Sequence, residues 1–206
     1  MIGVIDYGIG NTSAFLNVFQ RLGVKATTVR STKTLSEVDK IILPGVGHFG
    51  KAITMLWQSG LSESLEKRVR EDGVPILGVC VGMQMFTKKS DEADVEGLNW
   101  IQGHVKAFPN TNGSSFLPTP HMGWNKVDCD FDCPLFKQGF EKEAQFYFLH
   151  SYCFSPAYSD SCIGVSDYHG EFVCAVKSKN VYGFQFHPEK SLANGIRLLT
   201  NFASTM

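Results

Sequence analysis

Two short segments carry residue types that could perform nucleophilic catalysis. In GVCVGMQ, Cys80 stands between Gly78 and Gly82, where an apolar run ends and a helical pattern begins. A sharp strand-to-helix turn lifts its central residue off a sheet, and glycines flank it because side chains there would collide with the neighbouring backbone. The pattern predicts a nucleophile elbow centred on Cys80. A buried structural cysteine is the alternative, and GxCxG alone would favour it.

The second segment, QFHPEKS at residues 185–191, supplies a base. His187 follows the apolar run VYGFQF, and Pro188 favours an extended or turning backbone that lets Glu189 orient the imidazole. A cysteine nucleophile, a histidine base and a carboxylate that fixes the tautomer form a generalised catalytic triad. A surface turn before a helix is the alternative for this segment. Together, the two segments favour nucleophilic catalysis.

Other segments suggest weaker chemistry. PGVG at 44–47 has two glycines that free the backbone to point an N–H group into a cleft, as an oxyanion hole requires, although it could be a plain turn. YGIGN at 7–11 lacks GxGxxG, so no dinucleotide site is predicted. Cys129 and Cys133 have no second Cys/His pair, so neither a metal site nor a cofactor is expected.

Alternating strands and helices must position these segments. The first half predicts strands at MIGVID, KATTVR, DKIILPG and VPILGVC, separated by helices at TSAFLNVFQRLG, HFGKAITMLWQSG and LSESLEKRVREDG. Most of these strands lack polar alternation, which predicts an α/β fold with a flavodoxin-like, mostly parallel sheet flanked by helices. Functional loops of such sheets lie at the carboxyl ends of the strands, and the loops Tyr7–Asn11, Pro44–Gly47 and Gly78–Gly82 all fall there.

The second half predicts short strands with an antiparallel or mixed arrangement, followed by an amphipathic helix from about Ser191. The predicted strands cover Gly103–Phe108, Gly123–Val127, Gln145–Phe154, Ser161–Asp167, Phe172–Ser178 and Val181–Phe186. PHMGWN at 120–125 and FYFLHSY at 146–152 are dense in aromatic and polar residues, but residue type alone favours packing. We expect a single domain over residues 1–206.

Bulk properties narrow the partners and the compartment. The net charge is −1 over 206 residues, and scattered Lys and Arg residues give no footprint for nucleic acid or a membrane surface. The sequence has no apolar stretch near the roughly 18 residues of a membrane span, and MIGVIDYG does not resemble a signal peptide. The six cysteines show no compact disulfide framework. We therefore expect a cytoplasmic protein.

GVCVGMQ, PGVG and QFHPEKS together resemble the class I, or triad, glutamine amidotransferases. Within that class, IDYGIGN, PGVGHF, PHMGWN, FYFLHSY and GFQFHPEKS in this order resemble the HisH glutaminase subunits of imidazole glycerol phosphate synthase, over nearly the whole chain. The resemblance implies that glutamine is hydrolysed to glutamate and ammonia through a cysteine thioester, without a cofactor. It also implies a heterodimer with a HisF-like (βα)8-barrel synthase subunit, which uses the ammonia in histidine biosynthesis.

The resemblance also implies roles for individual residues. Cys80 would be the nucleophile, His187 the acid and base, and Glu189 its orienter. Substrate and the oxyanion would be bound by Gly45, Val46, Gly47, Gly82, Gln84, Glu92, Ser151 and Tyr152. The surface facing the synthase subunit would contain Asn11, Pro120, Met122, Trp124, Tyr147 and Lys190.

Departures from the family pattern leave the ammonia acceptor open. The first helix reads NTSAFLN, His48 follows PGVG where a small residue is usual, and Lys88 and Lys89 stand where acidic residues are common. One alternative is a paralogue that supplies ammonia for sugar amidination in surface-polysaccharide synthesis. Others are a catalytically silent regulatory subunit and a cysteine-hydrolase-like stress protein. The intact Cys/His/Glu pattern argues against silence, and Gln84 argues against a general hydrolase.

Overall fold

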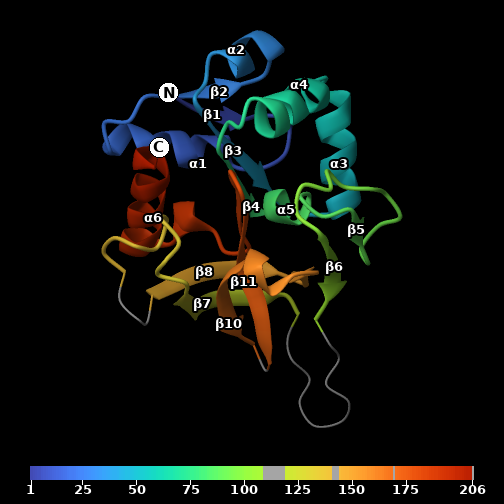
Figure 1. Cartoon of the computed structure of the whole chain (residues 1–206), viewed down its shortest axis with the longest axis vertical. Helices are drawn as coiled ribbons and strands as arrows, with labels where there is room; N and C mark the ends of the chain where they lie inside the picture. The colour runs from blue at the N-terminus through green and yellow to red at the C-terminus, as the bar shows by residue number, and fades with distance from the viewer. Residues whose placement is uncertain (109–118, 141–143, 169, 206) are drawn as a thin grey trace.

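A parallel α/β half and a β-rich half share one continuous sheet. The computed structural model describes residues 1–108, 119–140, 144–168 and 170–205. Its 12-stranded sheet runs in the order β2-β1-β3-β4-β12-β11-β10-β7-β8, with β5, β6 and β9 attached beside this path (Figure 1). Within the described residues, no helix is long and apolar enough to span a membrane.

The first five strands of this order are parallel neighbours. They are β2 (Ala26–Val29), β1 (Ile2–Ile5), β3 (Lys40–Gly45), β4 (Ile76–Cys80) and β12 (Val181–Phe184). Every residue of β1, β4 and β12 is buried, as expected where helices cover both faces of a parallel sheet. The order matches the flavodoxin-like doubly wound pattern, so the predicted fold class is confirmed.

Helices flank the parallel strands on both sides. Figure 1 shows α1 (Thr12–Arg21) and α6 (Leu192–Ser204) on one side, and α3 (Phe49–Gln58), α4 (Ser62–Glu66) and α5 (Val81–Gln84) on the other. The short α2 (Thr32–Ser36) follows β2, and a π-helical turn at Lys67–Glu71 extends α4. Gly60 and Gly73 have positive φ angles of 72° and 70° where these helical segments end, as the sequence predicts.

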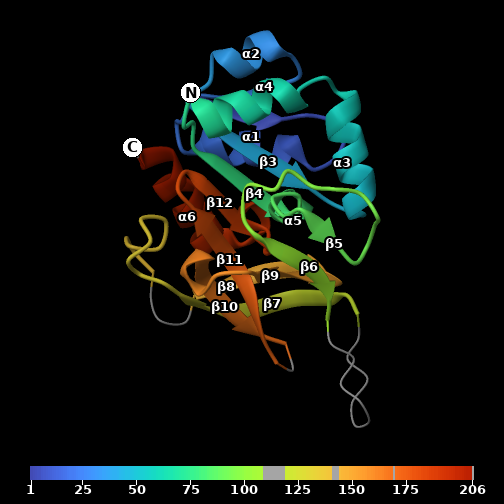
Figure 2. The same cartoon turned by 45° about the vertical axis from the view of Figure 1, so that its right-hand side comes forward.

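The remaining strands form the β-rich half, seen below the helices in Figure 2. The strands β11 (Glu171–Ser178), β10 (Cys162–Asp167), β7 (His121–Cys129) and β8 (Ala144–His150) continue the sheet from β12 through antiparallel pairs. Two further strands, β6 (Gly103–Ala107) and β9 (Tyr152–Pro156), pair with each other, and the two-residue β5 (Lys89–Ser90) lies beside β6.

Two strand predictions in the second half need correction. The predicted strand Gln145–Phe154 is two strands, because the His150 ring bonds to the Tyr152 carbonyl at 2.9 Å and the backbone turns at Ser151. Before that turn, β8 pairs with β7; after it, β9 pairs with β6 and β11. The last predicted strand lies next to β4 in the parallel sheet and ends at Phe184 rather than Phe186.

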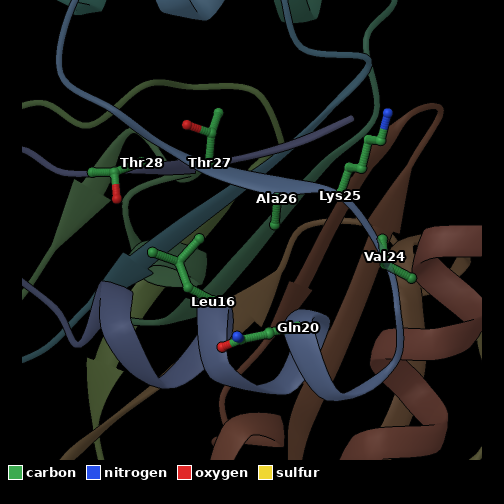
Figure 3. Close-up of a pocket in the computed structure, with 7 residues that line it drawn as sticks. All are labelled: Leu16, Gln20, Val24, Lys25, Ala26, Thr27 and Thr28. Carbon is green, nitrogen blue, oxygen red and sulfur yellow. The ribbon is translucent and has the colours of Figure 1, made fainter.

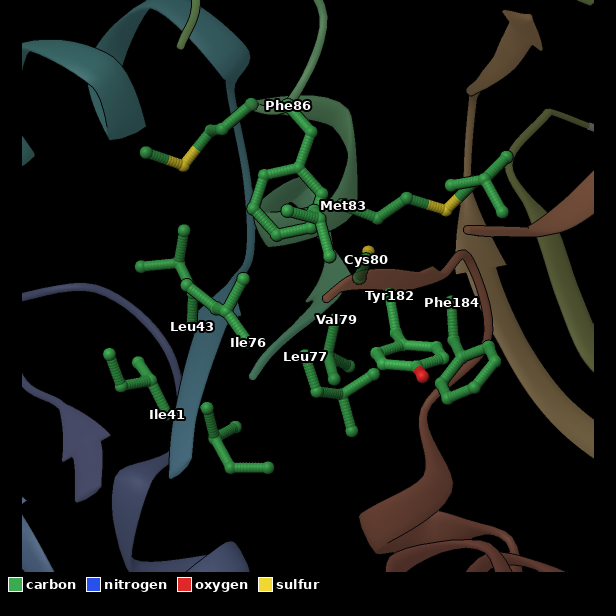
Figure 4. Packing of buried hydrophobic residues seen from close by; sticks show 14 of the residues in the cluster. Ile41, Leu43, Ile76, Leu77, Val79, Cys80, Met83, Phe86, Tyr182 and Phe184 are labelled. Atoms are coloured by element: carbon green, nitrogen blue, oxygen red, sulfur yellow. The ribbon is translucent and has the colours of Figure 1, made fainter. Parts of the chain in front are cut away.

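Apolar side chains from β3, β4, β12 and α5 form the core beneath Cys80 (Figure 4). Close packing leaves no room for a side chain at two glycines. A Cβ atom on Gly78 would lie 2.6 Å from the Phe86 ring, and one on Gly183 would lie 2.6 Å from Met83 Cγ. Helix α5 therefore rests directly on β4 and β12, which fixes the position of Cys80 above them.

Candidate active site

Cys80 occupies a strained turn between β4 and α5. Its backbone angles are φ 57° and ψ −115°, a region that residues other than glycine rarely adopt. The residue is only 4% exposed, and its Cα lies opposite Gly45 in the pairing of β3 with β4. The geometry matches a nucleophile elbow, in which local strain presents one side chain at the end of a strand.

Glycines allow the end of β3 to pack against this elbow. A Cβ atom on Gly82 would lie 2.0 Å from the Leu43 carbonyl oxygen, and one on Gly45 would lie 2.3 Å from the Gly82 nitrogen. Contacts this short exclude any side chain. The backbones of PGVG and GVCVG are therefore in direct contact, which brings the predicted oxyanion segment next to Cys80.

The rest of PGVG is anchored at one end and open at the other. The buried Tyr7 hydroxyl donates a hydrogen bond to the Pro44 carbonyl at 2.8 Å, and burial raises the pKa of Tyr7 well above its usual value, so it stays a donor. Gly47 has a positive φ of 83°, and the Val46 side chain is 44% exposed. The segment is thus fixed at Pro44, and Val46 faces solvent.

His187 and Glu189 form a buried pair just after β12. His187 Nδ1 lies 2.8 Å from Glu189 Oε1, and the two side chains are 2% and 3% exposed. A 3₁₀ turn at Pro188–Lys190 brings the carboxylate back to the ring. The His187 backbone N–H donates to the Tyr147 carbonyl at 2.8 Å, and Ser191 Oγ donates to the His187 carbonyl at 2.6 Å. Backbone and side chain of His187 are therefore both held in place.

The pKa of His187 depends on burial and on two neighbours, Cys80 and Glu189. Burial alone lowers the pKa of His187, but electrostatic interactions with Cys80 and Glu189 outweigh burial and raise the pKa to about 9. Because the carboxylate accepts from Nδ1–H, the other ring nitrogen, Nε2, is the one that can exchange a proton. Within the described residues, Nε2 is buried and has no hydrogen-bond partner.

The thiol of Cys80 has two further neighbours that sequence reasoning missed. Its Sγ atom lies 3.7 Å from the Leu149 carbonyl and 3.8 Å from Gln185 Nε2. Gln185 is fully buried, and its amide is positioned to donate to sulfur. One signal was available, because Gln185 lies only two residues before His187 in the segment QFHPEKS.

Gln84 and Tyr152, predicted to bind substrate, meet inside the protein. Gln84 is 2% exposed, and its Nε2 donates to the Tyr152 carbonyl and to Gln185 Oε1, at 3.0 Å each. Ser151, also predicted, lies partly buried at the turn between β8 and β9. The Gln84 amide group therefore connects Tyr152, which was predicted, with Gln185, which was not.

Glu92 and His48 both engage the start of α3, directly after PGVG. Glu92 Oε2 accepts from the Phe49 backbone N–H at 2.7 Å, and His48 Nδ1 accepts from the Gly50 N–H at 3.1 Å. These side chains satisfy donors that the first turn of a helix leaves unpaired. His48, which departs from the family pattern, thus has a structural role as the N-cap of α3.

Three of the predicted partner-facing residues gather on one surface, which we call the aromatic surface cluster: Trp124, Tyr147 and Lys190. The rings of Trp124 and Tyr147 meet edge to face at 6.1 Å between centroids, and Lys190 Nζ lies 5.7 Å from the Tyr147 centroid. Trp124 is 47% exposed although it is a tryptophan. The other three predicted residues, Asn11, Pro120 and Met122, are also exposed.

A hollow of about 490 Å³ at the sheet edge contains none of the predicted site residues (Figure 3). It lies between α1 and β2, and among the described residues that line it only Lys25 carries a charge. The described residues also include no group of three or more His, Cys, Asp or Glu side chains that could hold a metal ion. The chemistry-bearing residues instead converge at the carboxyl ends of β3, β4 and β12.

The site has a strained cysteine at one strand end of a doubly wound sheet and a buried His–Glu pair after the neighbouring strand. This arrangement is typical of a cysteine-dependent α/β enzyme. The family model described as glutamine amidotransferase class-I matches residues 3–206. The chain therefore belongs to the class-I glutamine amidotransferases, and the resemblance found in the sequence is confirmed.

Individual relatives agree with this assignment. The chain is 47% identical to the imidazole glycerol phosphate synthase subunit HisH of Bdellovibrio bacteriovorus, covering 98% of this chain and 99% of the relative. It is 45% identical to HisH of Leptospira interrogans, covering 99% and 100%. A crystal structure of a glutamine amidotransferase superposes with a TM-score of 0.73 at 19% identity, covering 99% of both chains, which supports the fold.

Proposed function

We propose that this chain is the glutaminase subunit of an imidazole glycerol phosphate synthase, and that it supplies ammonia for histidine biosynthesis. The full-length similarity to relatives named HisH supports the pathway. The observation that carries the chemistry is the His187–Glu189 pair, whose ring interacts electrostatically with Cys80. We further propose that residues 1–206 act as one catalytic domain, in the cytoplasm.

The reaction begins with the Cys80 thiolate paired with the His187 imidazolium. The thiolate attacks the side-chain amide carbon of glutamine, and backbone N–H groups near Gly82 and PGVG stabilise the oxyanion. His187 Nε2 then gives its proton to the departing nitrogen, which leaves as ammonia. The product is a γ-glutamyl thioester on Cys80.

Hydrolysis of the thioester reverses these roles. His187, now neutral, takes a proton from water as the hydroxide attacks the thioester carbonyl, and glutamate leaves while the thiolate is restored. One water is consumed, and one glutamate and one ammonia are released for each glutamine. Glu189 keeps Nδ1 protonated throughout, so that Nε2 alone moves protons.

The proposed chemistry is tested by glutamate release in the complex with the synthase subunit. Cys80→Ala should abolish it, and His187→Ala should cost at least about tenfold more than Glu189→Ala, because a base is harder to replace than its orienter. Cys162→Ala, which removes a partly buried thiol in β10, is the matched control and should keep full activity. Unchanged glutamate release in Cys80→Ala would refute the mechanism.

We also propose that the partner is a (βα)8-barrel synthase subunit that binds over the aromatic surface cluster. Exposed tryptophans surrounded by other aromatic groups commonly dominate binding energy. Trp124→Ala should weaken the heterodimer by about 2 kcal/mol or more, roughly 30-fold in Kd. Trp57→Ala in α3, where Trp57 is 51% exposed, is the control and should leave Kd unchanged.

The choice of partner discriminates between the two pathways. If glutamate release is stimulated by a histidine-pathway barrel subunit, the proposed function holds. If it is stimulated only by a partner from surface-polysaccharide synthesis, the sugar-amidination alternative is correct. A chain that releases no glutamate with either partner would be the silent regulatory subunit.

A further inference from the structure

A chain of hydrogen bonds outside the proposed triad runs through the β-rich half. Asn125 Nδ2 lies 3.3 Å from His121 Nε2, and His121 Nδ1 lies 3.1 Å from His150 Nε2. His150 Nδ1 in turn lies 2.9 Å from the Tyr152 carbonyl oxygen. His121 and His150 are 3% and 5% exposed, so water does not compete for these contacts.

The chemistry of the end groups fixes the direction of every bond. A carbonyl only accepts, so His150 must donate from Nδ1–H, and its Nε2 then accepts from Nδ1–H of His121. His121 Nε2 is left as an acceptor for the Asn125 amide group, which also donates to the Asp167 carbonyl at 2.7 Å. Both imidazoles must be neutral and protonated on Nδ1, since a second proton on His150 would face the donor of His121.

The surroundings support neutral, fixed rings. Burial lowers the pKa of His121 to about 4, and burial is also the main reason that the pKa of His150 falls to about 3. The His121 ring stacks between Phe148, at 4.7 Å, and Tyr168, at 4.0 Å between centroids. The tautomers are therefore held by packing as well as by hydrogen bonds.

The hydrogen-bond chain continues from Tyr152 to the nucleophile, Cys80. The Tyr152 carbonyl accepts from Gln84 as well, and the second proton of the Gln84 amide goes to Gln185 Oε1. With its oxygen used in this way, Gln185 must turn its amide nitrogen toward Cys80, where Nε2 lies 3.8 Å from sulfur.

We propose that Asn125, His121 and His150 are positioning residues for the Cys80 nucleophile. They hold the Tyr152 carbonyl, which fixes Gln84, and Gln84 fixes the Gln185 amide so that it donates to sulfur. Met122 and Trp124 alternate with His121 and Asn125 along β7. The hydrogen-bond chain therefore begins directly behind the surface that we propose faces the partner. The inference rests on the proposed function for its kinetic consequences, but not for its structural ones.

The structural part is tested by NMR on the complete chain labelled with 15N. Long-range 1H–15N spectra distinguish the two neutral tautomers and the doubly protonated ring of each histidine. At neutral pH both His121 and His150 should be protonated on Nδ1 only. Protonation on Nε2, or on both nitrogens, of either ring would overturn the proposal without any variant having to fold.

The kinetic part compares two substitutions at one position. His121→Phe keeps a ring between Phe148 and Tyr168 but has no donor, whereas His121→Asn keeps a donor near the Nδ1 position and loses the ring. Phe172→Leu is the control, because the Phe172 ring packs against His150 at 5.3 Å between centroids but takes no part in the hydrogen-bond chain. His121→Phe should lower the kcat for glutamate release about tenfold, as loss of one net hydrogen bond predicts, and His121→Asn should restore most of it.

Two results would contradict the positioning role. One is a kcat of His121→Phe equal to that of Phe172→Leu, and the other is a kcat of His121→Asn as low as that of His121→Phe.

Alkylation of Cys80 by iodoacetamide, followed by mass spectrometry, gives a second readout that needs neither glutamine nor partner. Alkylation at neutral pH should slow in His121→Phe and recover in His121→Asn. If the protein shows no glutaminase activity, the proposed function fails. The histidine tautomers and the Cys80 alkylation rates would still decide the positioning role.

Discussion

The strained turn at Cys80 predicts that the stability of a variant without the nucleophile depends on which residue replaces it. Both Cys80→Ala and Cys80→Gly remove the thiol and its contacts, so those losses largely cancel when the two variants are compared. Alanine must still adopt φ 57° and ψ −115°, whereas glycine adopts such angles readily. We therefore expect Cys80→Gly to be more stable than Cys80→Ala, the reverse of the usual order.

The size of the difference follows from two opposing contributions. A non-glycine residue in a sparsely populated backbone region costs about 1–3 kcal/mol. Glycine loses more conformational entropy on folding, about 0.5–1 kcal/mol relative to alanine. The midpoints of these two ranges give Cys80→Gly a net advantage of about 1.2 kcal/mol, or roughly 2–5 °C in Tm for a chain of this size.

Urea titration and thermal unfolding of the two variants measure this difference. A matched pair at the next residue, Val81→Gly and Val81→Ala, gives the control, because Val81 begins α5 and glycine is unfavourable in a helix. There glycine should be the less stable variant by about 0.5–1 kcal/mol. If Cys80→Gly is no more stable than Cys80→Ala, Cys80 does not store backbone strain in the folded protein.

Two further predictions concern the same region. The pKa of His187 rises from 6.5 to about 9 on folding, so its contribution to stability is complete below about pH 6.5 and is lost as pH rises through 9. Unfolding free energies at pH 6 and pH 9.5 should differ by on the order of 1–3 kcal/mol, and Glu189→Gln should reduce that difference. An equal difference in the variant would contradict the conclusion that Glu189 raises the pKa of His187. Gly82→Ala should cost more than about 3 kcal/mol in urea titration, because its Cβ would lie 2.0 Å from the Leu43 carbonyl. Gly47→Ala, with nothing within 4 Å, should cost only about 1 kcal/mol, and equal costs would refute the packing argument.

Local signals explain what the sequence could predict. The strand, turn and helix around Cys80 are specified by neighbouring residues, since the apolar run, the two glycines and the helical pattern all lie within one short segment. His187 and Glu189 are two residues apart, so their contact at 2.8 Å needs only the turn that Pro188 favours. The parallel sheet followed from the alternation of apolar strands with helices.

Contacts between distant segments explain what the sequence could not predict. His121 and His150 lie directly opposite each other only in the observed register of β7 with β8, and no local pattern specifies that register. Composition alone favoured packing for both segments, because aromatic residues dominate them. The break between β8 and β9 was missed for a different reason, since a bond from the His150 ring to the Tyr152 carbonyl leaves no signal in residue spacing.

The pairing of β7 with β8 matters for both ends of the proposed triad. The Tyr147 side chain belongs to the aromatic surface cluster, while its carbonyl accepts from the His187 backbone N–H at 2.8 Å, so β8 holds the base. On β7, Trp124 lies at the surface and its neighbour Asn125 begins the hydrogen-bond chain that ends at Cys80. Nucleophile and base are therefore supported from two paired strands beneath one exposed surface. A shift of β7 relative to β8 would separate His121 from His150, because the two histidines lie opposite each other only in this register. The support of the base would survive such a shift, because the Tyr147 carbonyl belongs to β8 alone.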